Sequence, residues 1–230
     1  METALTALRA CRLFASLSDG LLQETILPRG TYRVFAKNAA LISPGDLVDW
    51  FAVVVEGRVH ILQAFSDGGS SLMNSLLPGY VLGAELMCTE SLRAPYSAQA
   101  DADGTMLVFP RGLILEPGTL PEPERLQVCR ALLTLLAQEN MRKHYRLAIL
   151  SRRGLRDRIL TWLVMQVRRR GSRSFRAAFS REELADFLCV NRSALSHELS
   201  RMEQEGLIRF HKNHFTLLAE GEAQSAWATD

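Results

Sequence analysis

Residues 179–208 read FSREELADFLCVNRSALSHELSRMEQEGLI, and this stretch decides the fold. Ser180 and Glu183 have the spacing of a capping box, in which each side chain bonds to the backbone N–H of the other residue. A short helix is therefore expected to begin directly after Ser180. Asn191 is a preferred N-cap residue and predicts a second helix over about 192–205. Two short helices joined by a tight turn are typical of a helix-turn-helix.

The second of these helices has two different faces. Apolar side chains at i, i+4 and i+7 predict a buried face, which consists of Leu195, Leu199 and Met202. Small polar side chains form the opposite stripe, which consists of Ser193, Ser196, His197 and Ser200. A recognition helix presents such a face to the major groove of DNA. The pattern therefore predicts a DNA-binding helix.

A β-hairpin is expected directly after the second helix. Gly206 ends that helix, and two apolar runs, 207–210 and 215–218, bracket the polar tip 211–214. With this wing the segment becomes a winged helix-turn-helix. The two histidines of the tip are expected at the wing surface rather than in a metal site, because no third ligand is near them in the sequence.

Arg192 opens the recognition helix, and its guanidinium can donate two hydrogen bonds to O6 and N7 of guanine. His197, one turn later, can donate to the same acceptors; the alternatives are an ordinary surface arginine and a solvated histidine. Residues 151–215 contain 14 basic and 7 acidic side chains. This balance favours a polyanionic partner, with a solvated basic face as the alternative. The side chains expected to contact DNA are Arg192, Ser193, Ser196, His197, Ser180, Arg181, Arg201 and Lys212, with the arginines of 168–176 neutralising phosphates.

A long helix is predicted over 122–150, where no glycine and, after Pro123, no proline occurs. At about 1.5 Å per residue this helix would be roughly 40 Å long. A stripe with 3-4-3-4 spacing predicts a coiled-coil seam and hence a homodimer. Packing on the chain's own domain is the alternative. The expected interface residues are Leu126, Cys129, Leu133, Leu136, Asn140 and Leu147.

The chain before this helix has a different pattern. The first 28 residues predict short helices, one of them capped by Ser18. From residue 30 to about 110, short β-rich pieces alternate with turns and predict an antiparallel sandwich or barrel. The predicted turns include Pro44-Gly45, Glu56-Gly57, residues 66–69 and Pro78-Gly79. The chain is thus expected to be an α+β protein with three parts: an antiparallel β-roll sensor domain (1–120), a dimerisation helix (121–150) and a winged helix-turn-helix DNA-binding domain (151–230).

Composition excludes several classes of protein. The chain is 47% hydrophobic, as globular proteins are, and no run approaches the roughly 20 apolar residues of a membrane helix. The first residues lack the long apolar segment of a secretory leader. The four cysteines form no Cys-x-x-Cys pair, which excludes a zinc ribbon of the usual spacing and fits a reducing cytoplasm.

The motifs in 179–208 resemble those of the CRP/FNR superfamily of bacterial transcription factors, named after the cAMP receptor protein and the fumarate–nitrate regulator. Weaker similarity lies in Val55-Glu56-Gly57-Arg58-Val59 and in residues 77–83, which resemble the β-roll turns of the family. The resemblance covers nearly the whole chain. It implies a cyclic-nucleotide-binding-like roll, a homodimer on a two-fold operator in double-stranded DNA, contact with RNA polymerase, and an effector site between roll and long helix. In place of a common family arginine and of the turn glycine, this chain has His197 and Cys189.

The effector segment implied by this resemblance departs from the cAMP-binding members. Those members hold the cyclic phosphate with a Gly-Glu pair and, ten residues after the Glu, an Arg-Ser pair. Here Gly83 precedes Ala84, and Ala94-Pro95 occupy the second pair. A buried phosphate without a guanidinium is unfavourable, so we expect a small-molecule effector other than cAMP. The candidate effector-binding residues are Gly83, Glu85, Leu86 and Arg93.

Two other interpretations stay open. A redox- or gas-sensing regulator of the same fold would hold an iron–sulfur cluster or haem. Only Cys11 lies near the N-terminus, and the candidate haem ligands are His60 and His144. A metal-dependent cupin-like enzyme would need clustered histidines, but residues 1–143 contain only one. We therefore expect a transcription regulator rather than an enzyme, with no metal site and with its cofactor undetermined.

Overall fold

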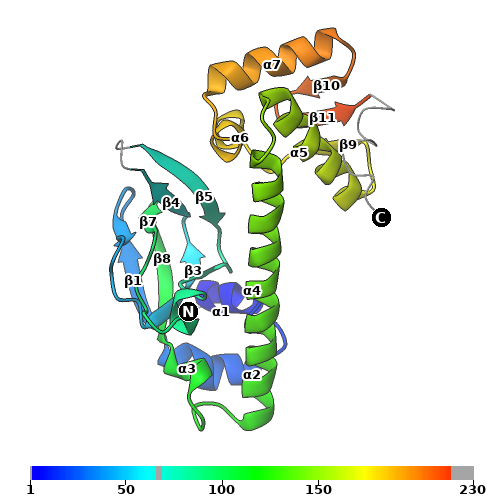
Figure 1. Ribbon diagram of the computed structural model, residues 1–230. Coiled ribbons are helices and arrows are strands. Elements are labelled where there is room, and N and C mark those ends of the chain that lie inside the picture. Colours follow the sequence, from blue (N-terminus) through cyan, green and yellow to red (C-terminus); the bar gives the residue numbers. More distant parts are fainter. Residues whose placement is uncertain (1, 66–68, 219–230) are drawn as a thin grey trace. The chain divides into compact units, whose positions relative to one another are not determined.

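The computed structural model describes residues 2–65 and 69–218 (Figure 1). The chain divides into two compact units, Met1–Asn140 and Met141–Asp230, which we call the first and the second unit. Three of the four residues in the predicted turn at 66–69 lie outside the described residues. Within the described part, no helix is both long enough and apolar enough to span a bilayer.

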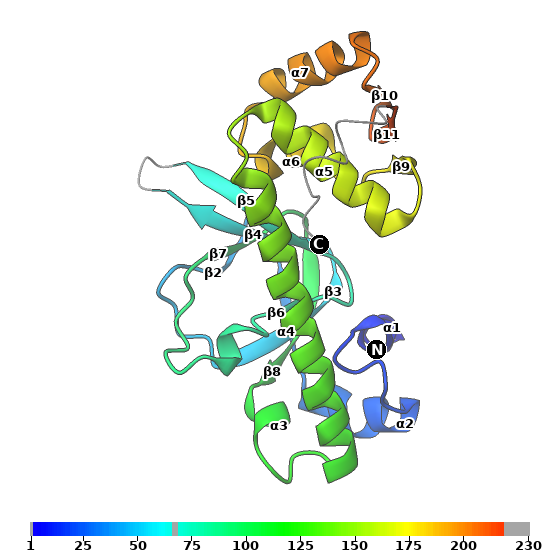
Figure 2. The same cartoon turned by 45° about the vertical axis from the view of Figure 1, so that its right-hand side comes forward.

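The first unit contains two four-stranded antiparallel sheets, with strand orders β1-β8-β3-β6 and β2-β7-β4-β5 (Figures 1 and 2). This arrangement confirms the predicted antiparallel β architecture. The strands β2 and β6 were not predicted because they contain only three and two residues. The strands are β1 (Thr31–Phe35), β2 (Ala40–Ile42), β3 (Trp50–Glu56), β4 (Val59–Ala64), β5 (Ser70–Leu76), β6 (Val81–Leu82), β7 (Ser97–Ala100) and β8 (Gly104–Pro110).

Two apolar cores fill the first unit. Ala52 and Val54 of β3 point into a core between the two sheets, and Phe51 and Val53 point into a core that the helices cover. This strand is buried on both faces, which explains its continuous apolar run. The covering helices are α1 (Glu2–Ala10), α2 (Asp19–Leu21), η1 (Leu22–Ile26), η2 (Leu27–Arg29) and α3 (Gly112–Leu115), and the short η3 (Leu86–Cys88) follows β6.

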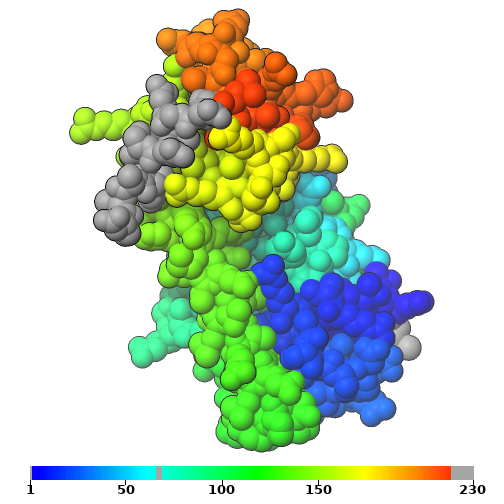
Figure 3. Space-filling view, turned by 90° about the vertical axis from the view of Figure 1, so that its right-hand side faces the viewer, coloured from blue at the N-terminus to red at the C-terminus, as the bar shows by residue number. Residues whose placement is uncertain are grey.

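Helix α4 (Glu122–Leu150) has the predicted bounds and begins in the first unit. Val128 and Leu132 bury one side of it in the core under the covering helices. The opposite side stays at the surface, where the α4 atoms are visible in green in Figure 3. Leu126, Leu133 and Leu147 on that side are 57%, 69% and 66% exposed. The predicted seam is therefore divided: Cys129 and Leu136 are half-buried against the first unit, while the three exposed leucines and Asn140 face outward.

The second unit is a winged helix-turn-helix, as predicted. Helices α5, α6 and α7 pack with a three-stranded sheet of order β10-β11-β9. Trp162 lies at its centre, with its ring edge-on to those of Phe175 and Phe215. Strand β9 was not predicted because it is three residues long in an arginine-rich stretch. The elements are α5 (Leu155–Arg170), β9 (Ser174–Arg176), α6 (Arg181–Phe187), α7 (Arg192–Gln204), β10 (Ile208–His211) and β11 (His214–Leu217).

Candidate nucleic-acid interface

Helix α6 begins with the predicted capping box. The Ser180 Oγ atom accepts a hydrogen bond from the Glu183 backbone N–H at 3.1 Å, and the Glu183 carboxylate accepts one from the Ser180 N–H at 2.7 Å. Ser180 was predicted to contact DNA, and the structure places its hydroxyl in this cap. The cap satisfies two backbone donors and fixes the start of the helix.

The turn between α6 and α7 has a left-handed residue. Cys189 has a φ angle of 55°, a conformation that glycine adopts with less strain than a residue with a Cβ atom. The turn is held by backbone bonds from Cys189 N–H to Asp186 O and from Val190 N–H to Ala185 O. Asn191 then caps α7, because its Oδ1 atom accepts from the Ala194 N–H at 2.7 Å. The recognition helix thus starts at a defined residue.

Helix α7 presents its polar stripe to solvent. Its apolar positions, Leu195, Leu199 and Met202, are fully buried. Arg192, Ser193, His197 and Ser200 are exposed, and Ser196 is half-buried. Among the described residues, neither the Arg192 guanidinium nor the His197 imidazole makes a hydrogen bond or ion pair. The Ser193 hydroxyl donates to the Asn191 Oδ1 atom at 2.9 Å. The donors of Arg192 and His197 are therefore accessible at the surface of α7.

Arg181 links α6 to the wing. Its guanidinium lies over the rings of Phe210 and Phe215, 4.9 and 5.4 Å from their centroids, and its Nη2 atom donates to the Lys212 carbonyl at 2.8 Å. Burial lowers the Arg181 pKa, and the charge of Arg192 adds to the effect. This half-buried side chain anchors the wing, whereas the sequence suggested a phosphate contact.

The remaining predicted phosphate-binding side chains lie at the surface. Lys212 is exposed at the wing tip, with a φ angle of 51°. Arg201 is exposed as well, and its Nε atom lies 3.2 Å from a Glu205 carboxylate oxygen. The arginines that end α5 and border β9 extend this basic surface: Arg168, Arg169, Arg170, Arg173 and Arg176 are all exposed. Such a surface attracts a polyanion over a wide area.

Arg156 fastens α7 to α5. Its Nε atom donates to Glu198 at 2.6 Å, and its two terminal nitrogens donate to Glu205 at 2.7 and 2.9 Å. Hydrogen bonds from Arg156 hold the pKa of Glu205 below its usual range. No sequence pattern predicts this network, because residues 42 and 49 positions apart carry no local signal of contact. The bidentate pairing holds the recognition helix along its length.

The predicted effector residues of the first unit do not form a cyclic-phosphate site. Glu85 accepts a hydrogen bond from the Tyr96 hydroxyl at 2.6 Å, and Arg93 donates to the Gly45 carbonyl at 2.9 Å. Leu86 is buried between the sheets, and Gly83 has a left-handed φ of 81°. The guanidinium and the carboxylate thus serve separate partners. The residues present do not fit a cyclic nucleotide.

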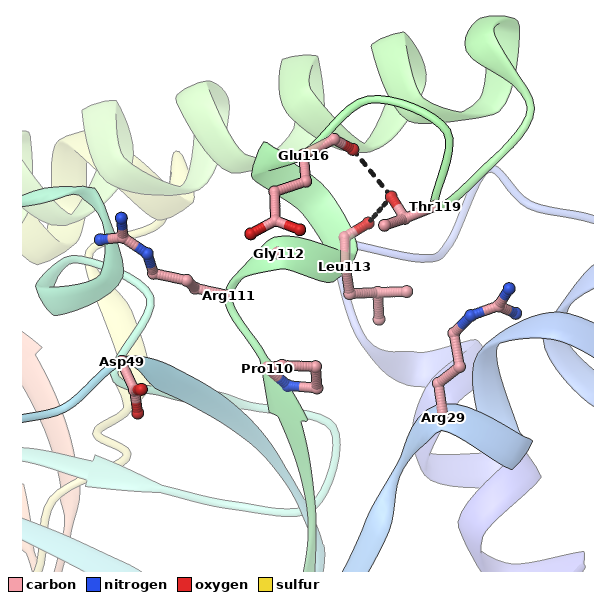
Figure 4. Close-up of a pocket in the computed structure, with 8 residues that line it drawn as sticks. All are labelled: Arg29, Asp49, Pro110, Arg111, Gly112, Leu113, Glu116 and Thr119. Carbon is pink, nitrogen blue, oxygen red and sulfur yellow. Dashed lines mark hydrogen bonds between the residues drawn. The ribbon is translucent and has the colours of Figure 1, made fainter.

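A pocket of about 490 Å³ lies elsewhere in the first unit (Figure 4). Its polar lining combines two guanidiniums with two carboxylates, and the hydroxyl of Thr119 donates to the carbonyls of Leu113 and Glu116. None of the predicted effector residues lines it. The lining residues are Arg29, Asp49, Pro110, Arg111, Gly112, Leu113, Glu116 and Thr119.

Neither of the two candidate haem ligands lines this pocket. His60 is on β4 between Val59 and Ile61, which contact the core, and its Nε2 atom lies 3.7 Å from a carboxylate oxygen of Asp101. His144 is exposed on α4. Within residues 2–65 and 69–218, no group of three or more His, Cys, Asp or Glu side chains is placed to hold a metal ion.

Each of the two units matches one known domain family. Residues 32–116 match the cyclic nucleotide-binding domain, and residues 157–221 match the Crp-like helix-turn-helix domain. The first match covers the sheets and the second covers the winged helix-turn-helix.

The chain is also similar to proteins that are named as regulators. The nitrogen fixation regulation protein FixK of Azorhizobium caulinodans is 27% identical over 207 residues, which are 87% of this chain and 80% of that protein. The transcriptional activator protein FnrL of Cereibacter sphaeroides is 25% identical over 82% of this chain and 77% of that protein. Among solved structures, FixK2 from Bradyrhizobium japonicum has a TM-score of 0.60 at 20% identity, covering 87% of this chain and 98% of that one. The catabolite activator protein of Thermus thermophilus has a TM-score of 0.54 at 22% identity, covering 90% and 93%. From these matches and from its capped, exposed recognition helix, the chain belongs to the CRP/FNR family of DNA-binding transcription regulators.

Proposed function

We propose that the protein binds a two-fold symmetric operator as a homodimer and regulates transcription with RNA polymerase in the cytoplasm. The observation that carries this proposal is the polar stripe of α7, where Arg192, Ser193 and His197 are exposed and Ser196 is half-buried. Asn191 caps this helix, and Arg156 holds it. A capped helix whose Arg192 and His197 donors make no bond within the described residues suits insertion into the major groove. Lys212 and the arginines of 168–176 then bind phosphates, as their exposure and charge permit.

The outward face of α4 supports the dimer. Leu126, Leu133 and Leu147 lie seven and fourteen residues apart and stay largely exposed. Their spacing suits a coiled-coil seam with a second copy of the same helix. Asn140 continues the series between them and fixes the register of such a seam. We place Cys129 and Leu136 at its border, since both also contact the first unit.

Selection from a library of random duplexes tests the proposal. The protein should enrich one sequence made of two inverted half-sites, centred about 10 bp apart. Affinity for the selected duplex should fall steeply as salt concentration rises, because bound phosphates release counterions. Enrichment of no sequence, together with weak binding at low salt, would contradict the proposal.

The first unit is proposed to sense a small molecule other than cAMP. The separate engagement of Glu85 by Tyr96 and of Arg93 by Gly45 supports this exclusion of cAMP. A thermal-shift screen of metabolites, with cAMP as the expected negative, identifies the effector through the stabilisation that a ligand gives the folded state. A redox- or gas-sensing regulator is the alternative, and a visible absorption band of the purified protein would favour it.

A further inference from the structure

Arg146 is the only charged side chain that is buried among the described residues, with 8% of its surface exposed. It belongs to the last turns of α4, which form part of the second unit. Removing a charge from water is unfavourable unless bonds compensate for it. The groups that Arg146 contacts should therefore indicate the role of this side chain.

Its partners are the end of α6. The Arg146 Nε atom donates to the Phe187 carbonyl at 3.3 Å, and Nη2 donates to the Asp186 carbonyl at 3.4 Å. The guanidinium also lies 5.2 Å from the centroid of the Phe187 ring. The last carbonyls of a helix lack partners within the helix and carry partial negative charge, so a cation is favourable there.

Arg158 reaches the same turn from α5. Its Nη1 atom donates to the Leu188 carbonyl at 3.2 Å, and its Nε atom donates to the Arg152 carbonyl at 2.9 Å. Guanidiniums from two segments thus bind three successive carbonyls, those of residues 186–188. The next residues are Cys189, which has the left-handed backbone, and then Val190 and the N-cap Asn191. The arginines therefore fix the turn that sets where the recognition helix starts.

We propose that Arg146 is a positioning residue for operator recognition, because it fixes the helix-turn-helix turn to the last turns of α4. The inference rests on the proposed function, in which α4 forms the dimer and α7 reads DNA. A displacement of the end of α4 would then move the start of α7 with it.

The test uses the full-length protein and the duplex that the wild type selects. Arg146→Met keeps the length and apolar stem of the side chain and removes its donors. Arg153→Met is the matched control, because Arg153 is exposed in the loop between α4 and α5. We expect Arg146→Met to bind the selected duplex about five- to thirtyfold more weakly, with unchanged affinity for unrelated duplexes. The control should bind both duplexes with the affinity of the wild type, except for an equal effect on both from the loss of one surface charge.

Hydrogen exchange distinguishes a local loosening of the turn from a general loss of stability. The amides of Cys189 and Val190 should exchange faster in Arg146→Met, while the Leu217 amide of the wing should be unchanged. If Arg146→Met does not fold, Arg146→Lys keeps the charge with a single donating group and should show smaller shifts in the same direction.

The possible failures are distinguishable. A variant with the affinity and exchange of the control would overturn the role of Arg146, as would equal losses on specific and unrelated duplexes or a uniform rise in exchange. A wild-type protein that selects no sequence would instead overturn the proposed function.

Discussion

Arg192 and His197 show how single residues give α7 its chemistry. Both are exposed and lie five residues, or about 1.4 helical turns, apart, and the buried Leu195 and Leu199 hold the opposite face inward. A guanidinium can form two hydrogen bonds with guanine, whereas an imidazole forms one. Arg192 should therefore contribute more to sequence selectivity than His197 does.

Replacing Arg192 should reduce selectivity at one base pair. Arg192→Ala is expected to lose roughly 1–3 kcal/mol of discrimination there, because the paired donors to guanine are removed. Arg201→Ala is the contrasting variant: loss of a phosphate contact should weaken binding evenly over all sequences and reduce the salt slope by about one. Affinities for the selected duplex and for its single-base variants measure both effects. An even loss for Arg192→Ala would assign it to phosphate instead.

The ionisation of Glu205 should make the free energy of unfolding depend on pH. Its pKa is lowered in the folded state by hydrogen bonds from Arg156, so its contribution is present above the unfolded pKa and is lost as pH falls through the folded value. Thermal unfolding of the wild type and of Glu205→Gln should therefore differ at neutral pH and converge in acid. A difference that stays constant across this range would show that the pair does not act through its charge.

The thiols should react according to their surroundings. Cys11 is buried, and this burial raises its pKa to about 11, so little thiolate forms at neutral pH. Cys88 and Cys189 are exposed. Mass spectrometry after brief treatment with a maleimide should find the two exposed cysteines modified and Cys11 unmodified until the protein unfolds. Modification of Cys11 in the native protein would contradict the packing of α1 on the first unit.

At the scale of elements, local signals predicted α6 and α7 well. The capping box and the Asn191 cap lie within four residues of the helix starts, so the sequence contains all the information that these starts need. The strands β2, β6 and β9 contain two or three residues each, and pairing with neighbouring strands holds them in place. No local pattern predicts such strands.

The contacts of the site were harder to predict than its exposed face. The stripe on α7 followed from helical periodicity. The roles of Arg146, Arg156 and Arg181 depend on partners that lie 31 to 49 residues away in the sequence. Periodicity cannot identify these partners, because they meet only when the helices pack.

The outward face of α4 gives a prediction for dimer formation. Leu133→Glu introduces a charge where a second copy should bury a leucine, which is worth about 1.5–3 kcal/mol for each protomer. We expect the dimer dissociation constant to rise by at least about a hundredfold, since a two-fold interface counts the change twice. Sedimentation velocity measures this constant. Gln127→Glu, an equal change in charge at another exposed position of α4, should leave it unaltered; equal behaviour of the two variants would reject the seam.

At the scale of the whole molecule, the two units differ in the chemistry of their surfaces and cores. The first has two apolar cores and a pocket with a mixed-charge lining, which suits the recognition of a small polar molecule. The second presents the basic surface and the recognition helix. Helix α4 begins in the first unit and ends in the second.

Two recognition helices should act together on one duplex, so binding should depend on the spacing of the half-sites. Inserting five base pairs between the selected half-sites rotates one of them by about half a helical turn. We predict that the wild-type protein binds the original duplex with two chains and loses most of its affinity for the lengthened one. Equal affinity for both duplexes, or one chain per duplex, would contradict the account.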